Sequence, residues 1–293
     1  MSINYDYLSK IKAQISLYSS RRTTNILDGE FKSIYRGRSL DFDDLREYSP
    51  GDNVKDIDWK SSSKTGKVLI RRYVAEKKHN VLFIVDSGTK MQGDTLDGEE
   101  KQQVALSTLG TIAYLVDKHG DDTALLQNTA SGCDFSYFSS GNVHFEKMLA
   151  RCAKNLKDEG RFDVSALLTY AAEKIKRKMV IFVITDMDGL ERVSEKLLRE
   201  LSVNNDVLFI NVDDAYYTGD ELYDMDKKRY AFDFMTKSKR LMRAERKLRE
   251  SIYMRASSML ARYGMSMTSV SRESDIIDRV VELLERHRNE HIG

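Results

Sequence analysis

The sequence predicts an α/β protein built on a doubly wound, mostly parallel sheet of about six strands, with a small β-rich lobe at the amino terminus. From residue 80 onward, short apolar runs alternate with longer segments of helical periodicity, which is typical of the β-α units of a parallel sheet. Residues 1–79 are instead rich in charge, turn residues and short alternating runs such as KVLIRRYV at 67–74. We therefore expect two domains, 1–79 and 80–293.

The spacing of apolar residues predicts the individual elements. A short amphipathic helix is expected over residues 4–19. In the second domain, apolar runs predict strands at 81–86, 122–128, 135–139, 179–185, 206–212 and 265–270. Periodic segments between them predict helices near 99–118, 142–156, 163–177, 190–201, 236–263 and 273–289. This alternation places helices on both faces of the sheet.

Two of the predicted strands end in an aspartate. The stretch VLFIVDSGTKMQG at 81–93 passes from five apolar residues into Asp86, and MVIFVITDMDG at 179–189 passes into Asp186. In doubly wound sheets, ligands collect at the carboxyl ends of the strands where the strand order reverses. We therefore expect the functional site at this edge. Lys90 lies in the first of the two loops, where a cation held by both aspartates would sit.

The composition limits the class of protein. Of 293 residues, 32% are charged and 41% hydrophobic, and Lys+Arg 47 nearly balances Asp+Glu 46, which is typical of a globular chain and not of a disordered or nucleic-acid-coating one. No apolar run approaches the roughly 20 residues that cross a bilayer. The start, MSINYDYLSK, has no apolar signal-peptide region, and 2 cysteines are too few for a secreted disulfide framework. We expect a cytoplasmic protein without membrane insertion.

The segment GRSLDFDDLREYSPGDNVKDIDWKSSSKTGKVLIRRYVAEKKHNVLFIVD, residues 37–86, resembles the signature of the bacterial proteins grouped as domain-of-unknown-function family 58. The rest of the chain is similar to a von Willebrand factor type A domain, including YAFDFMTKSKR and GMSMTSVSRESDIIDRVVELLERH. The resemblance implies a von Willebrand factor A-like fold and an adaptor role beside a AAA+ ATPase of the MoxR type. The signature residues are Arg46, Tyr48, Pro50, Gly51, Asp52, Asp56, Asp58 and Trp59.

The same resemblance implies a degenerate metal-ion-dependent adhesion site. A-type domains typically bind a divalent cation through a D-x-S-x-S loop, a threonine on a second loop and an aspartate after the fourth strand. Asp86 and Asp186 match the two aspartates. The serine positions are Gly88 and Lys90, and the threonine position falls on Phe162, so three oxygen ligands for a hard cation are missing.

The chemistry of this loop leaves three alternatives for Lys90. Its ammonium would pair with Asp86 and Asp186 in a metal-free pseudo-site, or it would point into water, or Mg²⁺ would bind the two aspartates with further oxygens reached through water. We expect no resident cofactor, with Mg²⁺ as the alternative. In the first case Lys90 would receive an acidic side chain of a partner. The partner-binding face is expected to comprise Asp86, Ser87, Gly88, Thr89, Lys90, Phe162, Asp186 and Asp188.

The amino-terminal lobe carries a mixed charge cluster around the Pro50-Gly51 turn. Its acidic residues invite a metal-dependent hydrolase or nuclease interpretation, but DFDDLR departs from the EF-hand pattern, and interleaved basic residues favour a structural ion-pair network. Trp59, the only tryptophan, is expected to pack the lobe onto the main domain, and an exposed anchor for a partner is the alternative. The acidic members are Asp41, Asp43, Asp44, Glu47, Asp52, Asp56 and Asp58.

The charge reverses late in the chain. Six acidic and no basic residues lie between Asp213 and Asp226, whereas twelve basic and three acidic residues lie between Lys227 and Arg262. The predicted helix at 236–263 therefore has a basic outer face, which would bind RNA, bind an acidic protein surface or stay solvated. A net charge of +1 and the lack of a nucleic-acid-binding motif make nucleic acid the least favoured of the three.

Sequence motifs of common catalytic sites are absent. There is no G-x-x-x-x-G-K-[ST], no G-x-S-x-G and no H-E-x-x-H. The sequence thus predicts a non-enzymatic protein-interaction or adaptor module that, by the resemblance, works with a MoxR-type AAA+ ATPase in protein remodelling or complex assembly. The alternatives are a metal-dependent hydrolase or nuclease using the amino-terminal acidic cluster, and an RNA-associated protein using the basic helix 236–263.

Overall fold

The computed structural model describes residues 44–49, 54, 57–72, 78–157, 160, 163–218, 223–224, 229–230 and 238–292. The helix predicted at 4–19 lies outside these residues. For Arg46 and Asp44 the structure describes the strand to which they belong but not their side chains. The predicted site and signature residues outside the described part of the chain are Asp41, Asp43, Pro50, Gly51, Asp52, Asp56 and Phe162.

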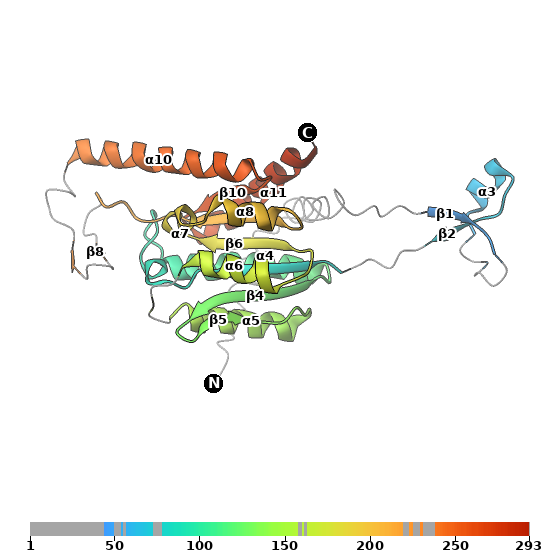
Figure 1. The fold of residues 1–293 in the computed structure, drawn as a ribbon, viewed down its shortest axis with the longest axis horizontal. Helices are drawn as coiled ribbons and strands as arrows, with labels where there is room; N and C mark the ends of the chain where they lie inside the picture. Colours follow the sequence, from blue (N-terminus) through green and yellow to red (C-terminus); the bar gives the residue numbers. More distant parts are fainter. Residues whose placement is uncertain are drawn as a thin grey trace.

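One sheet of six strands organises the main body, in the order β10-β7-β6-β3-β4-β5 (Figure 1). All neighbouring strands are parallel except β4 and β5, which are antiparallel. The predicted doubly wound, mostly parallel sheet is therefore confirmed. The strands are β3 (Asn80–Val85), β4 (Asp122–Thr129), β5 (Gly132–Phe135), β6 (Val180–Thr185), β7 (Asp206–Val212) and β10 (Ser266–Val270).

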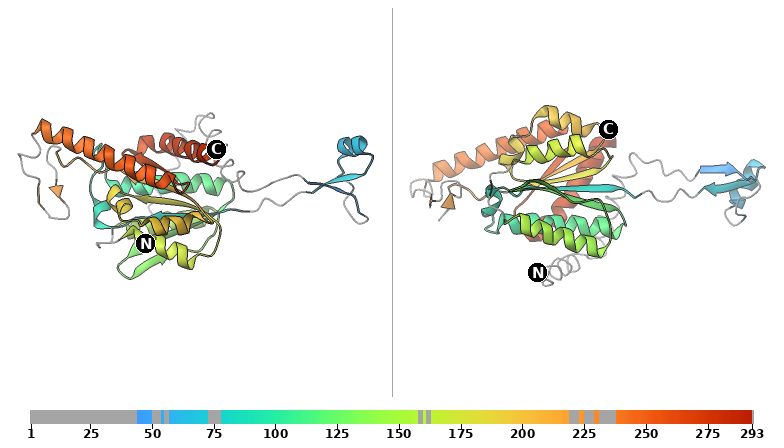
Figure 2. Two further views of the ribbon diagram at one scale, coloured as in Figure 1. Left: turned by 45° about the horizontal axis from the view of Figure 1, so that its top comes forward. Right: turned by 60° about the horizontal axis from the view of Figure 1, so that its bottom comes forward.

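Helices cover both faces of this sheet (Figure 2). One face is buried by α4 (Lys101–Lys118), α5 (Asn142–Asn155) and α11 (Ile276–Ile292), and the other by α6 (Val164–Lys174), α8 (Glu195–Ser202) and α10 (Lys239–Ala261). Within β3, Phe83 belongs to the first core and Leu82 to the second. The two-sided burial explains why the strands are continuous apolar runs and not alternating ones.

The edge strand β5 begins earlier than the predicted strand at 135–139. A two-residue loop joins β4 to β5, so that Gly132 already pairs with Thr129. Gly132 adopts a φ of 115°, which favours glycine over other residues and lets the chain reverse at once. The predicted segment still lies beside β4, because Ser139 forms an isolated bridge to Thr123.

The predicted helix at 190–201 is divided into α7 (Met187–Glu191) and α8. Ser194 caps the second helix, since its hydroxyl accepts a hydrogen bond from the Leu197 amide at 3.3 Å. The first helix begins directly after β6, with Asp186 as its N-cap. After residue 79 the structure also describes two short 3-10 helices, η2 (Thr89–Gln92) and η3 (Glu273–Asp275), and a small antiparallel pair, β8 (Tyr223–Asp224) and β9 (Arg229–Tyr230).

The described part of the amino-terminal lobe consists of two antiparallel strands, β1 (Asp44–Glu47) and β2 (Leu69–Arg72), and the helix α3 (Trp59–Thr65) between them (Figure 1). Asp58 is the N-cap of α3 and accepts hydrogen bonds from the amides of Lys60 and Ser61, each at 3.1 Å. Trp59 is 66% exposed, so the expectation that it packs the lobe onto the main domain is wrong. It is the first residue of α3 and directly follows the N-cap Asp58.

Among the described helices, none combines the length and the apolar character that a membrane span requires.

Candidate functional site

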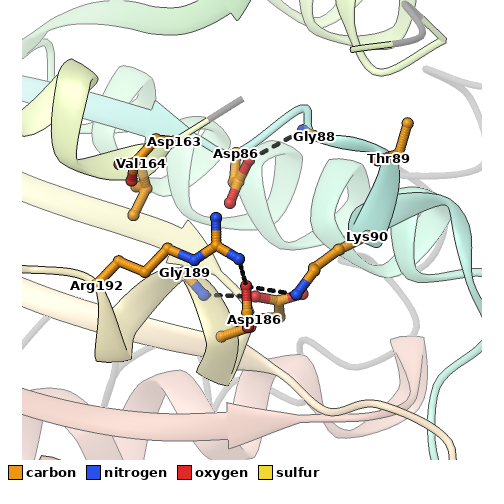
Figure 3. A pocket seen from close by; sticks show the side chains of 10 residues that line it. Asp86, Gly88, Thr89, Lys90, Asp163, Val164, Asp186, Gly189 and Arg192 are labelled. Atoms are coloured by element: carbon orange, nitrogen blue, oxygen red, sulfur yellow. Dashed lines mark hydrogen bonds and ion pairs between the residues drawn. The ribbon is translucent and has the colours of Figure 1, made fainter. Parts of the chain in front are cut away.

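The candidate site lies where the strand order of the sheet reverses. From the central strand β3 the chain moves to β4 on one side and later returns to β6 on the other. Asp86 and Asp186 follow these two adjacent strands and are 6% and 2% exposed. A cavity of about 180 Å³ opens beside them (Figure 3), lined by Asp86, Gly88, Thr89, Lys90, Asp163, Val164, Asp186, Asp188, Gly189 and Arg192.

Asp86 is bound by neutral donors. One carboxylate oxygen accepts a hydrogen bond from the Gly88 amide at 2.9 Å, and the other accepts one from the Thr185 hydroxyl at 2.9 Å. Within the described residues, no basic side chain forms an ion pair with it. Burial raises the pKa of the Asp86 carboxyl above its ordinary value, and the nearby Asp186 charge adds to the rise. Asp86 is thus the carboxyl of this cavity whose ionised form is disfavoured.

The cation that faces Asp186 is Lys101, the first residue of α4. Its side chain is fully buried, and its Nζ lies 2.9 Å from Asp186 Oδ2. The same Nζ forms a close ion pair with Asp214 Oδ1 and donates to the Lys90 carbonyl at 2.9 Å. All three hydrogens of the ammonium therefore have an acceptor, which a buried charge requires.

The charges of this ion pair stabilise each other. Burial alone would lower the pKa of Lys101, but the carboxylates of Asp186 and Asp214 raise it above the ordinary value. Burial likewise would raise the pKa of Asp186, yet the Lys101 charge and a hydrogen bond from the Gly189 amide at 2.8 Å hold it below the usual range. Lys101 and Asp186 are therefore both charged at neutral pH.

Lys90 occupies a different position from the one predicted. Its Nζ lies 2.7 Å from Asp188 Oδ2, and the guanidinium of Arg192 lies 2.6 Å from the same oxygen. All three side chains are 39% to 49% exposed and form a rim cluster at the mouth of the cavity, toward which Lys90 and Arg192 reach from opposite sides (Figure 3). The expected ion pair of Lys90 with Asp86 and Asp186 is wrong, because the loop turns the ammonium outward and offers only its carbonyl to the interior.

Backbone packing brings the two aspartates together. A Cβ atom on Gly189 would lie 2.2 Å from the Thr185 hydroxyl and 3.1 Å from Asp86 Oδ2, so a glycine is needed for this close approach. Ser87, predicted on the same face, is fully buried and donates its hydroxyl to the Asn128 carbonyl at 2.7 Å. That hydroxyl is engaged with the backbone of β4 and does not line the cavity.

Sequence reasoning missed Lys101, Asp214 and Arg192. Two signals pointed to Lys101: it precedes Val104 and Ala105 by three and four residues, which places it on the buried stripe of α4, and a lysine in the first helical turn opposes the helix dipole. Asp214 also had a signal, since the run VLFINVDD ends a third strand in aspartate. Arg192 had none beyond its i+4 spacing from Asp188.

The donor set at this site does not fit a hexacoordinate divalent ion. Both carboxylate oxygens of Asp186 already accept from protein donors, and the Lys101 ammonium beside it repels a second cation. Gly88 and Lys90 offer no side-chain oxygen. Across the part of the chain that the structure describes, no group of three or more His, Cys, Asp or Glu residues is arranged to hold a metal ion.

Comparison with known proteins gives a family match. The model of a family described as "Protein of unknown function DUF58" matches residues 44–218, a range that runs across the proposed domain boundary at residue 79. Two uncharacterised proteins, Mb1516 of Mycobacterium bovis and Rv1480 of Mycobacterium tuberculosis, are each 21% identical over 200 residues. The match covers 68% of this chain, and the chain spans 62% of the length of these relatives.

Similar solved structures include BatB from Bacteroides thetaiotaomicron, with a TM-score of 0.46 and 11% identity over 72% of this chain and 99% of that one. A von Willebrand factor type A protein from Catenulispora acidiphila has a TM-score of 0.41 and 7% identity over 76% of this chain and 44% of that one. These likenesses concern the fold alone. The sheet itself has the predicted architecture, with six strands in a doubly wound order and one antiparallel edge strand.

Proposed function

Since this chain belongs to the family of proteins of unknown function DUF58, whose description assigns no activity, we propose from the geometry of its site that it is a non-enzymatic protein-interaction module. Its working face is the strand-end cavity, and it binds its partner without a metal ion. The observation that carries this proposal is the fully buried Lys101, which joins Asp186 to Asp214.

The Lys101 ammonium takes the place that a metal cation would have between the strand ends. It bridges the residue after β6 to a residue after β7, so the two loops are held in place before any partner arrives. A preorganised face loses less conformational entropy when it binds. Because the side chain of Lys101 is fully buried, it positions the face and does not touch the partner.

The rim cluster supplies the contact for a partner. Lys90 and Arg192 share the single carboxylate of Asp188, so the cluster has one positive charge in excess. Since these side chains are about half exposed, an aspartate or glutamate from a partner can be accepted by both cations in charge-assisted hydrogen bonds. The proposal thus keeps Lys90 as a receptor for an acidic side chain and adds Arg192 to it.

The partner in this proposal is a MoxR-type AAA+ ATPase, and the shared task is protein remodelling or complex assembly. The resemblance to this family implies an adaptor role beside such an ATPase, and the site adds a face suited to protein contact. The proposal implies that both proteins work in the cytoplasm.

The test is a binding titration of the purified chain against the purified MoxR-type ATPase of the same organism, kept free of nucleotide. We expect equal affinity within twofold in EDTA and in Mg²⁺. Replacing Lys90 and Arg192 together by alanine should weaken binding at least tenfold. The matched control is Lys196→Ala on α8, a basic side chain that is 87% exposed away from the cavity, and it should leave binding unchanged. Binding that disappears in EDTA and returns with Mg²⁺, or that ignores the rim variant, would overturn the proposal.

The structure describes contacts of two side chains of the acidic cluster, and neither contact supports the alternative of a metal-dependent hydrolase or nuclease. Glu47 forms an ion pair with Lys67, and Asp58 caps α3. The first contact joins two opposite charges and the second caps a helix, and both are structural roles. An Asp58→Asn variant distinguishes a catalytic from a structural role, because asparagine keeps the helix cap and removes the carboxylate. An enzyme that used this carboxylate would lose turnover while remaining folded.

A further inference from the structure

The amino-terminal half of α10 extends past the sheet instead of lying on it (Figure 1). Of its 23 residues, only Ala256 and Leu260 are buried, and both lie near the carboxyl end. A helix that served only the core would bury an apolar stripe along its whole length. The projecting half must therefore be explained by something other than the core of this domain.

Specific contacts hold this projecting half in place. Arg249 donates to the carbonyls of Asp214 at 2.6 Å and Ala215 at 2.5 Å, and its guanidinium lies 4.7 Å from the ring centre of Tyr216. One turn earlier, Glu245 accepts hydrogen bonds from the Tyr217 amide at 2.7 Å and the Thr218 hydroxyl at 2.6 Å. The helix is thus fixed to the segment after β7, with one face turned outward.

The outward face combines exposed leucines with basic residues. Leu241 and Leu248 are 40% and 57% exposed and lie seven residues apart, which places them on one stripe two turns apart. Arg240 and Lys247 have the same spacing and form a second stripe about 100° around the helix from the leucines, and both are exposed. Over the whole helix there are seven basic residues against two acidic ones, and Glu245 is already engaged by the segment it anchors.

We propose that this face of α10 binds an acidic amphipathic helix of a partner protein. The leucine stripe provides apolar area of the kind that a helix-in-groove or helix-on-helix contact buries, and the basic stripe selects a partner with acidic flanks. Nucleic acid fits less well, since phosphates would contact the basic stripe and leave the leucines exposed to water. The surface lies on a different element from the rim cluster, so it does not depend on the function proposed above.

A site-specific cross-link tests this proposal in cells of the source organism. A photoreactive benzoylphenylalanine is placed at Leu248 and, as a matched control, at Lys196 on α8. From position 248 we expect cross-links to partner peptides that carry net negative charge and apolar residues three and four apart. The charge-reversed pair Arg240→Glu and Lys247→Glu should lower their yield at least tenfold. Cross-links to nucleic acid, to residues 219–237 of the same chain, or at no more than the control yield would overturn the proposal.

A defined probe gives an independent readout. The purified protein is titrated with a synthetic helix bearing one leucine stripe flanked by glutamates, with a scrambled peptide of the same composition, and with a single-stranded RNA oligonucleotide. We expect the amphipathic peptide to bind at least tenfold more tightly than the scrambled one, and the pair Leu241→Ser and Leu248→Ser to remove that difference. All four altered side chains are exposed, so circular dichroism should be unchanged. RNA that binds more tightly than the peptide, with affinity falling steeply with salt, would assign the face to nucleic acid instead.

Discussion

Replacing Lys101 by methionine tests whether the buried ammonium organises the site. The change removes the charge and keeps an unbranched side chain of similar length. In the wild type the side chain is fully buried and bonds Asp186, Asp214 and the Lys90 carbonyl. The variant leaves Asp186, whose side chain is only 3% exposed, without its cation.

The magnitude follows from the burial of the two carboxylates. Removing one partner of a buried ion pair costs about 3–5 kcal/mol. Asp214 is 40% exposed, and burial raises the pKa of its carboxyl, so both Asp214 and Asp186 can escape part of the cost by taking up a proton. We therefore expect the free energy of unfolding at neutral pH to fall by about 3 kcal/mol. For a domain of this size that corresponds to a fall in Tm of roughly 6–12 °C.

The assay is urea unfolding followed by circular dichroism at neutral and at mildly acid pH. In the wild type the pKa of Asp186 is lowered by folding, so its contribution to stability is present above the unfolded pKa and is lost as the pH falls through the folded pKa. Without Lys101, burial raises that pKa, so the cost is greatest above the folded pKa and is relieved as the pH falls. The difference between wild type and variant should therefore shrink toward acid pH.

Two results would refute this reasoning: a loss below about 1 kcal/mol, which is the scale of an exposed ion pair, or a loss that does not change with pH. The double variant Lys101→Met with Asp186→Asn is the control. An asparagine oxygen can still accept the Gly189 amide, so we expect the second change to restore more than half of the lost stability.

Three further predictions concern single side chains. Gly189→Ala should lower the free energy of unfolding by about 1–3 kcal/mol because the new methyl group would lie 2.2 Å from the Thr185 hydroxyl. Gly93→Ala, whose nearest contact would be 3.9 Å away, should be nearly neutral, and equal urea midpoints for the two variants would contradict the packing argument. The fluorescence of Trp59 should shift little on unfolding since the ring is 66% exposed, whereas a large red shift would show that it is buried. Asp86→Asn should stabilise the protein more at neutral than at acid pH. The folded pKa of Asp86 is raised, so the wild type loses stability as the pH rises from the unfolded pKa through the folded one, and asparagine avoids that loss. Urea unfolding at both pH values checks this, and a variant that is less stable than the wild type at both would count against it.

The fold was predictable because its signals are local. A strand buried on both faces is apolar at nearly every position, so β3, β6 and β7 were evident from apolar runs of four to six residues. The errors fell where a single turn decides the outcome. The two-residue hairpin at Gly132 moved β5, and the cap at Ser194 divided the helix predicted at 190–201. Neither feature changes the apolar periodicity on which the prediction rested.

The site was predictable only in part, because a charge and its partner are joined by the fold and not by the sequence. The strand-end positions of Asp86 and Asp186 followed from the ends of two apolar runs. The choice of cation did not, since Lys90 is four residues from Asp86 whereas Lys101 is fifteen residues away and 85 residues from Asp186. Proximity in sequence favoured Lys90. A lysine on a half-exposed loop, however, gains little by entering a core. A lysine on the buried face of α4 must find carboxylates there or lose its charge. The periodicity of the following helix, and not the composition of the loop, therefore identifies the cation of this site.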